Sequence, residues 1–75
     1  MHHEGVYSTF MPTAEIQREI ISALRNAQSA LSMPALVQII QRNTSQPATT
    51  IRAAVLPLIS VRRIELTPER KLRLR

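Results

Sequence analysis

The apolar residues between positions 46 and 59 recur with the 3.6-residue period of a helix that buries one face. The buried positions in this pattern are Ala48, Ile51, Ala54, Val55, Leu58 and Ile59. The opposite face carries short, uncharged side chains, where a helix that only meets solvent usually carries Glu and Lys. Its outward positions are Gln46, Thr49, Thr50, Ala53 and Pro57, with Arg52 at the edge. We therefore predict a helix over residues 46–59 that approaches a binding partner closely.

Two earlier segments show the same helical period. The first begins at Thr13, which can cap free backbone amides, and Glu15 is favourably placed in its first turn. The second begins after Ser32, the predicted N-cap residue, has a proline in its first turn, and reaches about Gln41. A very short strand is expected at residues 30–31. The chain thus reads as helix, short strand and helix before the helix over 46–59.

The link between the helices over 33–41 and 46–59 is only a few residues long, which predicts a tight helix–turn–helix. Asn43 is the best candidate for the left-handed residue that ends the first of these helices, a position that Gly commonly occupies. Thr44 or Ser45 can then cap the second helix, and Pro47 falls within its first turn.

After Ser60 the period of the apolar residues changes from 3.6 to 2. Ile64 and Leu66 alternate with charged residues, and so do Leu72 and Leu74. The segments VRRIEL and KLRLR, joined by TPER, therefore predict a β-hairpin with one apolar face and one basic face.

Two lengths are open for the hairpin loop, since only an odd loop sets Leu66 opposite Leu72 on one face. A three-residue loop, Pro68–Arg70, requires Arg70 in the left-handed conformation. A five-residue loop spans Thr67–Lys71. Because neither loop contains Gly, we favour the longer one.

Charge is distributed unevenly along the chain, whose net charge is +5. Residues 1–41 hold two basic and three acidic side chains, whereas residues 42–75 hold eight basic and two acidic ones. Nine of the ten basic residues are Arg, whose planar guanidinium suits phosphates and guanine edges. The C-terminal half is therefore expected to contact a polyanion, and nucleic acid is the main candidate.

In sequence, the segment ALSMPALVQII…ATTIRAAVLPLISVRRIELTPERKLRL resembles the winged helix–turn–helix of small prokaryotic transcription regulators. The matching residues are Ser32 opening a helix, Ala48 and Thr49 starting the next, Ile51, Val55 and Leu58 on its core face, and Ile64 and Glu65 opening the wing. The resemblance covers about Thr13 to the C-terminus. It implies an α+β, mostly α, fold of three helices with a C-terminal two-stranded β-hairpin wing. Residues 1–12 are then a flexible N-terminal arm and residues 13–75 the winged-helix domain.

In proteins of this resemblance the last helix enters the major groove of DNA and the wing lies on the flanking backbone. The function that the resemblance implies is that of a sequence-specific duplex-DNA-binding protein, a small transcriptional regulator. The implied base or groove contacts are Gln46, Thr49, Thr50 and Ala53. The implied backbone and wing contacts are Arg42, Thr44, Ser45, Arg52, Arg62, Arg63, Arg70, Lys71, Arg73 and Arg75. Gln can pair with adenine, and a Thr methyl can meet a thymine methyl.

The composition argues against other classes of function. There is no Cys or Asp, both His residues lie in the arm, and no Gly-rich phosphate loop is present, so we predict no enzyme activity, no cofactor and no metal site. The two aromatic residues, Tyr7 and Phe10, also lie in the arm, which leaves no stacking platform for single-stranded RNA. Neither a membrane span nor a signal peptide is apparent, and a cytoplasmic location, at the nucleoid in a prokaryote, is expected.

The main alternative is a winged helix used for protein assembly without direct DNA readout. Leu56 supports it, because this residue lies well off the buried stripe of the helix over 46–59. For the DNA-binding function a homodimer is expected, since one small domain offers few DNA contacts. Ile21, beside the buried stripe of the first helix, is the preferred dimer seam, and Leu56 is the second choice.

Overall fold

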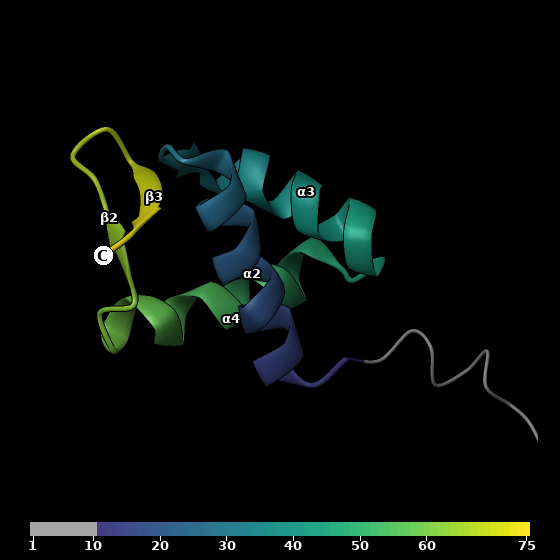
Figure 1. The fold of residues 1–75 in the computed structure, drawn as a ribbon. Coiled ribbons are helices and arrows are strands. Elements are labelled where there is room, and N and C mark those ends of the chain that lie inside the picture. Colours follow the sequence, from purple (N-terminus) through teal and green to yellow (C-terminus); the bar gives the residue numbers. More distant parts are fainter. Residues whose placement is uncertain (1–10) are drawn as a thin grey trace, which may run out of the picture.

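Residues 11–75, which the computed structural model describes, form three α-helices and three short β-strands (Figure 1). In chain order they are α2 (Thr13–Ala27), β1 (Leu31–Ser32), α3 (Met33–Thr44), α4 (Ala48–Ser60), β2 (Ile64–Leu66) and β3 (Lys71–Leu74). The mostly helical α+β class predicted from the sequence is therefore confirmed. Of the predicted arm, only Met11 and Pro12 fall within the described residues, and Met11 packs partly buried against the core.

The strands form one antiparallel sheet with the order β1-β3-β2. The predicted hairpin register is confirmed, because Leu66 lies opposite Leu72 and Ile64 opposite Leu74. The short strand expected at residues 30–31 is found at Leu31–Ser32 as β1, and it joins the hairpin as a third strand by pairing Leu31 with Leu72. Two residues are enough for this addition because β3 offers a second edge that β2 leaves unpaired.

The core lies where α2, α3 and α4 cross and is closed on one side by the sheet (Figure 1). Its largest fully buried side chains are Ile16, Ile20, Leu36, Ile40, Ile51, Val55, Ile64 and Leu72. The stripe predicted for α4 is confirmed, with Ile51, Val55 and Leu58 buried. Pro57 lacks an N–H and cannot bond to the carbonyl of Ala53, yet the helix continues for one more turn.

Ile21, the preferred residue for a dimer contact, is buried in the core of the domain. Ile21 is only 9% exposed and belongs to the core cluster, so the expectation that it stays partly exposed is wrong. The reason is that α4 and α3 both pack against α2, which widens its buried face beyond a single stripe. A contact between two copies of the chain would have to use another surface.

Side-chain capping matches the prediction at one helix start and not at the others. The Ser32 hydroxyl accepts a hydrogen bond from the backbone N–H of Ala35 at 3.3 Å, as expected for the N-cap of α3. Pro12 and Pro47 occupy the N-cap positions of α2 and α4, where no side-chain cap is made. The capping roles expected for Thr13, and for Thr44 or Ser45, are therefore wrong.

Helix α3 ends later than expected. Asn43 is helical, and Ser45 is the left-handed residue, with φ of 60° and its N–H bonded to the carbonyl of Gln41 at 2.8 Å. The Thr44 hydroxyl donates to the carbonyl of Ile40 at 2.7 Å, which keeps Thr44 within the last turn. The expectation of a left-handed Asn43 is thus wrong by two residues.

Substituting glycine at these two positions tests where α3 ends. Ser45→Gly should raise the free energy of unfolding by ~0.5–1 kcal/mol, because Gly adopts the left-handed conformation without steric cost. Asn43→Gly, the matched control inside the helix, should lower it by roughly 0.5 kcal/mol. Urea denaturation followed by circular dichroism measures both, and the opposite pair of signs would place the helix end at Asn43.

The hairpin loop has the shorter of the two lengths considered. Arg70 is left-handed, with φ of 64°, and its N–H donates to the carbonyl of Thr67 at 2.8 Å. The Thr67 N–H donates to the carbonyl of Lys71 at 2.7 Å, and the Thr67 hydroxyl accepts from the N–H of Lys71 at 3.0 Å. The preference for a five-residue loop is wrong, because these hydrogen bonds hold Arg70 in a conformation usually given to Gly.

Candidate nucleic-acid interface

The outward face of α4 is short-chained and uncharged over its N-terminal half. Thr49, Thr50 and Ala53 are exposed there, and Arg52 is exposed at the edge of the face. Burial of Ile51 and the residues in line with it fixes the rotation of the helix, so these side chains point away from the core. Three of the four residues predicted to contact bases are therefore available to a ligand.

The fourth, Gln46, is not available. It lies in the link between α3 and α4 and is only 5% exposed, so the expectation that it faces outward is wrong. The helical period was extended to Gln46 in the sequence, but α4 begins at Ala48, and a residue in a link does not follow the helical period. We leave Gln46 out of the candidate interface.

The turn before α4 contributes a cation and a hydroxyl. Arg42, in the last turn of α3, and Ser45 are both exposed. Thr44 is half-buried and its hydroxyl is already bonded to the carbonyl of Ile40, so it is a poorer contact than predicted. The N-cap residue of α4, Pro47, offers no side chain to cap its first amides.

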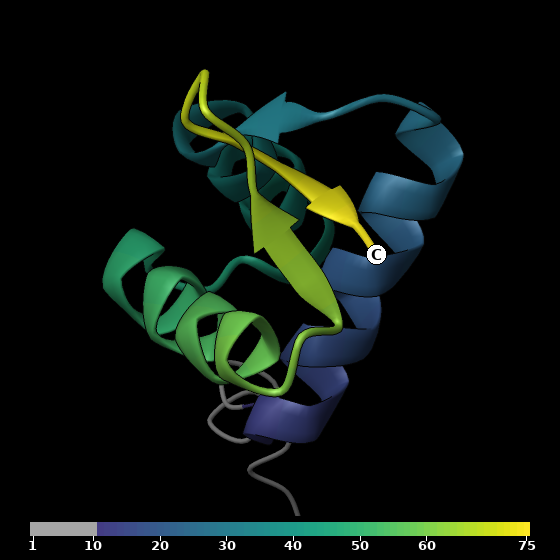
Figure 2. The ribbon, with the colours of Figure 1, turned by 90° about the vertical axis from the view of Figure 1, so that its left-hand side faces the viewer.

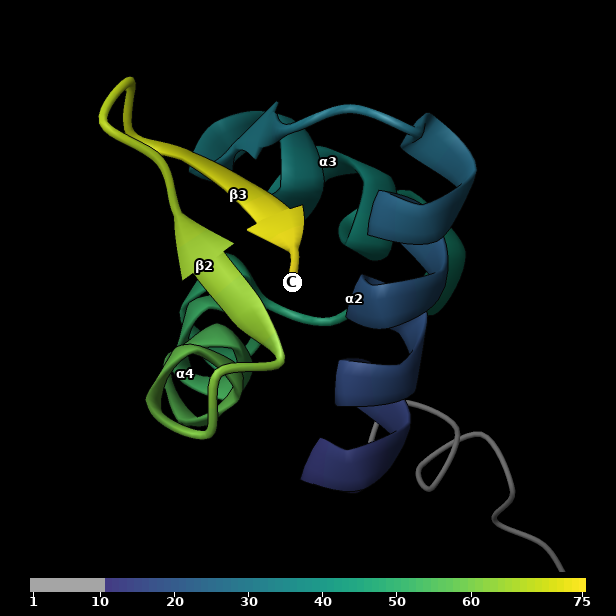
Figure 3. The same cartoon turned by 60° about the vertical axis from the view of Figure 1, so that its left-hand side comes forward.

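The tip of the β2–β3 hairpin carries Arg70 and Lys71, both exposed. Figure 2 shows this tip and α4 on one side of the domain and α2 on the other, and Figure 3 shows the same arrangement from a second direction. The structure therefore brings the hairpin tip to the side on which α4 is exposed.

The other two basic residues predicted for the wing lie elsewhere. Arg73 is the cross-strand partner of Glu65 and forms an ion pair with it, and Arg75 lies 3.6 Å from the same carboxylate. Arg73 also lines a cleft with Leu24 and Gln28 at the end of α2. Glu65 partly neutralises Arg73 and Arg75, and Arg73 lies beside the end of α2. We therefore do not count these two arginines with the basic hairpin tip.

Arg62 and Arg63 form the link from α4 to β2. Arg62 is left-handed, with φ of 64°, and its N–H donates to the carbonyl of Ile59 at 3.0 Å, while the Arg63 N–H donates to Leu58 at 2.9 Å. This pair of hydrogen bonds is a Schellman motif, which usually places Gly where Arg62 stands. The link is therefore rigid, and it directs Arg63 to a cleft beside α2.

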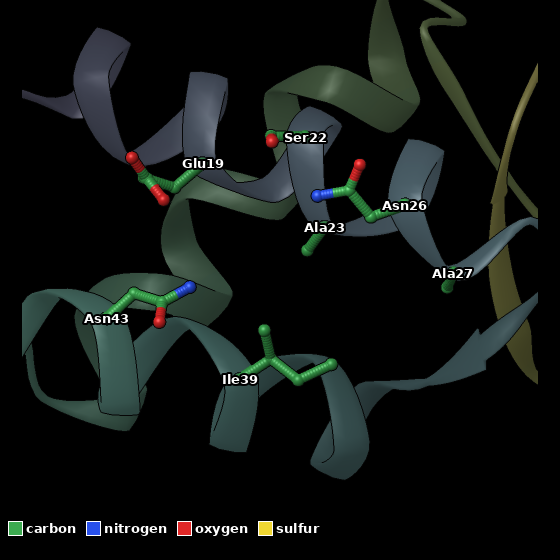
Figure 4. A pocket seen from close by; sticks show the side chains of 7 residues that line it. All are labelled: Glu19, Ser22, Ala23, Asn26, Ala27, Ile39 and Asn43. Atoms are coloured by element: carbon green, nitrogen blue, oxygen red, sulfur yellow. The ribbon is translucent and has the colours of Figure 1, made fainter.

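A groove between α2 and α3, with a volume of about 290 Å³, offers less chemistry (Figure 4). Glu19, Ser22 and Asn26 lie on its α2 side, and Ile39 and Asn43 on its α3 side. Among these lining residues the titratable group is the Glu19 carboxylate. Within residues 11–75, no three His, Asp or Glu side chains gather to hold a metal ion.

Comparisons of the chain with protein-family models, with curated proteins and with solved structures found no match. No helix among residues 11–75 is both long and apolar enough to cross a membrane. A functional proposal therefore rests on the arrangement of α4, the turn before it and the hairpin tip.

Proposed function

We propose that residues 13–75 form a winged helix that binds duplex DNA, with α4 in the major groove and the β2–β3 hairpin as the wing. One observation carries the proposal: α4, whose exposed N-terminal residues are uncharged apart from Arg52, and the basic hairpin tip lie on the same side of the domain (Figures 2 and 3). The order of helices and strands supports this proposal. A winged helix has a short strand between its first two helices, as β1 is here, and a C-terminal hairpin, as β2 and β3 are here.

The side chains on α4 suit a groove. A B-DNA major groove admits one α-helix, and short side chains let the helix backbone approach the base edges closely. The hydroxyls of Thr49 and Thr50 can bond to base edges, and their methyl groups and that of Ala53 can contact thymine methyls. Sequence preference would then come from a few contacts near the N-terminal end of α4.

The surrounding cations suit the DNA backbone. Arg52 lies at the edge of the exposed face of α4, and Arg42 is exposed in the last turn of α3, just before the link to α4. Both could bond to phosphates. Arg70 and Lys71 at the wing tip would reach phosphates further along the duplex. These contacts position the protein and make its affinity depend on salt.

Replacing Thr49 tests the proposed base contact. Thr49→Ala should change the preferred base at one position of the DNA site by ~1–3 kcal/mol, because a hydroxyl and a methyl are removed from the groove. Ser60→Ala, at the exposed C-terminal end of the same helix, is the matched control and should leave the preference unchanged. Selection from a random duplex library gives the preferred motifs, and identical motifs for the wild type and Thr49→Ala would remove Thr49 from the readout.

A second candidate function, protein assembly through α4, is favoured by Leu56. This residue is 61% exposed in the middle of the outward face, and Val61 and Leu66 are exposed to 65% and 58%. An assembly through this face would compete with entry into the groove. If α4 is an assembly surface, Leu56→Ser should turn a self-associated protein into a monomer at micromolar concentration while helicity is kept. Sedimentation velocity decides it, and a wild type that is monomeric without DNA would count against this candidate.

A further inference from the structure

An open cleft of about 420 Å³ is lined by residues of α2, by Leu58 near the end of α4 and by Arg63. Helix α2 lies on the side of the domain opposite α4 and the hairpin tip (Figures 2 and 3). Ile21 and Leu58 give the cleft an apolar floor, and the side chains of Arg18, Arg25 and Arg63 line it. The cleft was not apparent in the sequence, because Arg63 is 38 or more residues away from the two arginines of α2.

Each arginine is placed by regular structure. Arg18 and Arg25 are two helical turns apart on α2, so they lie on the same face, separated by about 10 Å along the helix axis. Arg63 stands across from α2 in the Schellman link, and its carbonyl accepts a hydrogen bond from the N–H of Arg75 at 3.2 Å. The backbone that carries all three arginines is thus held by hydrogen bonds.

Three arginine residues line this cleft. No carboxylate lines it, and within residues 11–75 none of the three arginines forms an ion pair. Glu65 is engaged with Arg73 and Arg75, and Glu19 lines the groove on the other side of α2. Arg25 also lines the neighbouring cleft at the end of α2, so its guanidinium is within reach of both. Like charges near one cleft repel each other, and a bound anion would relieve that repulsion.

We propose that this cleft binds a small organic anion that has an apolar body and two acidic groups. A guanidinium pairs with a carboxylate, phosphate or sulfonate through two parallel hydrogen bonds, and the floor of Ile21 and Leu58 would cover the apolar body. The separation of Arg18 and Arg25 favours two acidic groups over one. A volume of about 420 Å³ lies within the ~300–1,000 Å³ range of small-molecule sites.

Such a ligand would also touch the contact between α2 and α4. Gln17, which lines the cleft, donates a hydrogen bond from its side-chain amide to the carbonyl of Ala54 at 3.1 Å. Since the cleft lies on the α2 side, the anion and a DNA duplex on α4 would not exclude each other. The ligand would therefore not compete with DNA for the same surface.

Three probes separate the parts of this proposal by two-dimensional NMR titration of the full chain. A naphthalene disulfonate supplies an apolar body with two acidic groups, inorganic phosphate supplies charge alone, and naphthalenemethanol supplies an apolar body alone. The disulfonate should bind at least about tenfold more tightly than phosphate, and naphthalenemethanol should not bind measurably. The shifted backbone amides should be those of Gln17, Leu58 and Arg63.

Arg25→Gln should weaken the disulfonate by about tenfold, with Arg18→Gln as the second variant if Arg25→Gln does not fold. Arg52→Gln, on α4, is the matched control and should leave the affinity unchanged. Equal binding of phosphate and disulfonate, or an unchanged affinity in both cleft variants, would overturn the proposal. So would a short DNA duplex that shifts the same amides and displaces the disulfonate, since the cleft would then be a nucleic-acid surface.

Discussion

Replacing Ile51 with alanine is expected to lower the free energy of unfolding by about 2–4 kcal/mol. Ile51 is fully buried at the centre of the stripe that fixes α4 against α2 and α3, so truncation leaves a cavity that the helix cannot fill without moving. A domain of this size has a total stability of roughly 4–11 kcal/mol, so the loss would be a large share of it. Urea denaturation followed by circular dichroism measures the change.

The matched control for Ile51 is its neighbour on the outward face. Thr50 is exposed, and Thr50→Ala should change the free energy of unfolding by less than about 0.5 kcal/mol. Similar losses for the two variants would mean that α4 is rotated about its axis and that the proposed DNA face is wrong. The pair therefore tests the orientation of α4 without any DNA.

The sequence predicted those parts of the fold that depend on a long periodic pattern. The buried stripe of α4 needs Ile51, Val55 and Leu58 at helical spacing, and no other element type satisfies that spacing. The register of the hairpin follows in the same way from Leu66 and Leu72, because a slip of one residue would expose Leu72.

The parts that could not be predicted depend on contacts outside the local pattern. Ser45, Arg62 and Arg70 take left-handed conformations that local preference would give to Gly or Asn, at a cost of ~1–2 kcal/mol each, which the surrounding hydrogen bonds and packing outweigh. Gln46 is buried, and it lies in the link before α4, where the helical period does not set its exposure. The spacing of apolar residues in the sequence predicts neither the left-handed residues nor the burial of Gln46.

Charge counted along the chain also gave an incomplete description of the site. The count assigned the basic character to residues 42–75, and the hairpin tip agrees with it through Arg70 and Lys71. Folding, however, brings Arg18 and Arg25 of the other half to Arg63, and it pairs two hairpin arginines with Glu65. Surface charge depends on which residues meet in space, and only the structure supplies that.

Removing three cations from the proposed DNA side should have a larger effect on binding than any single change. In the triple variant Arg52→Gln, Arg70→Gln and Lys71→Gln, affinity for duplex DNA should fall at least about tenfold at ~0.1 M salt. The reason is that a phosphate without a protein contact keeps its condensed counterions, and the release of those counterions favours binding. The double variant Arg18→Gln and Arg25→Gln is the control, since these arginines lie on the α2 side. An equal loss in both variants would show that the protein binds DNA without a defined face.

The salt dependence of binding to a random-sequence DNA duplex, measured by fluorescence anisotropy, tests DNA binding most directly. For ~4–6 neutralised phosphates, the logarithm of the association constant should fall against the logarithm of the salt concentration with a slope between about −3.6 and −5.4. In the triple variant this slope should be less negative by about 2–3, since each lost phosphate contact removes about 0.9 from its magnitude. Absence of binding by the wild type at low salt would contradict the proposed function.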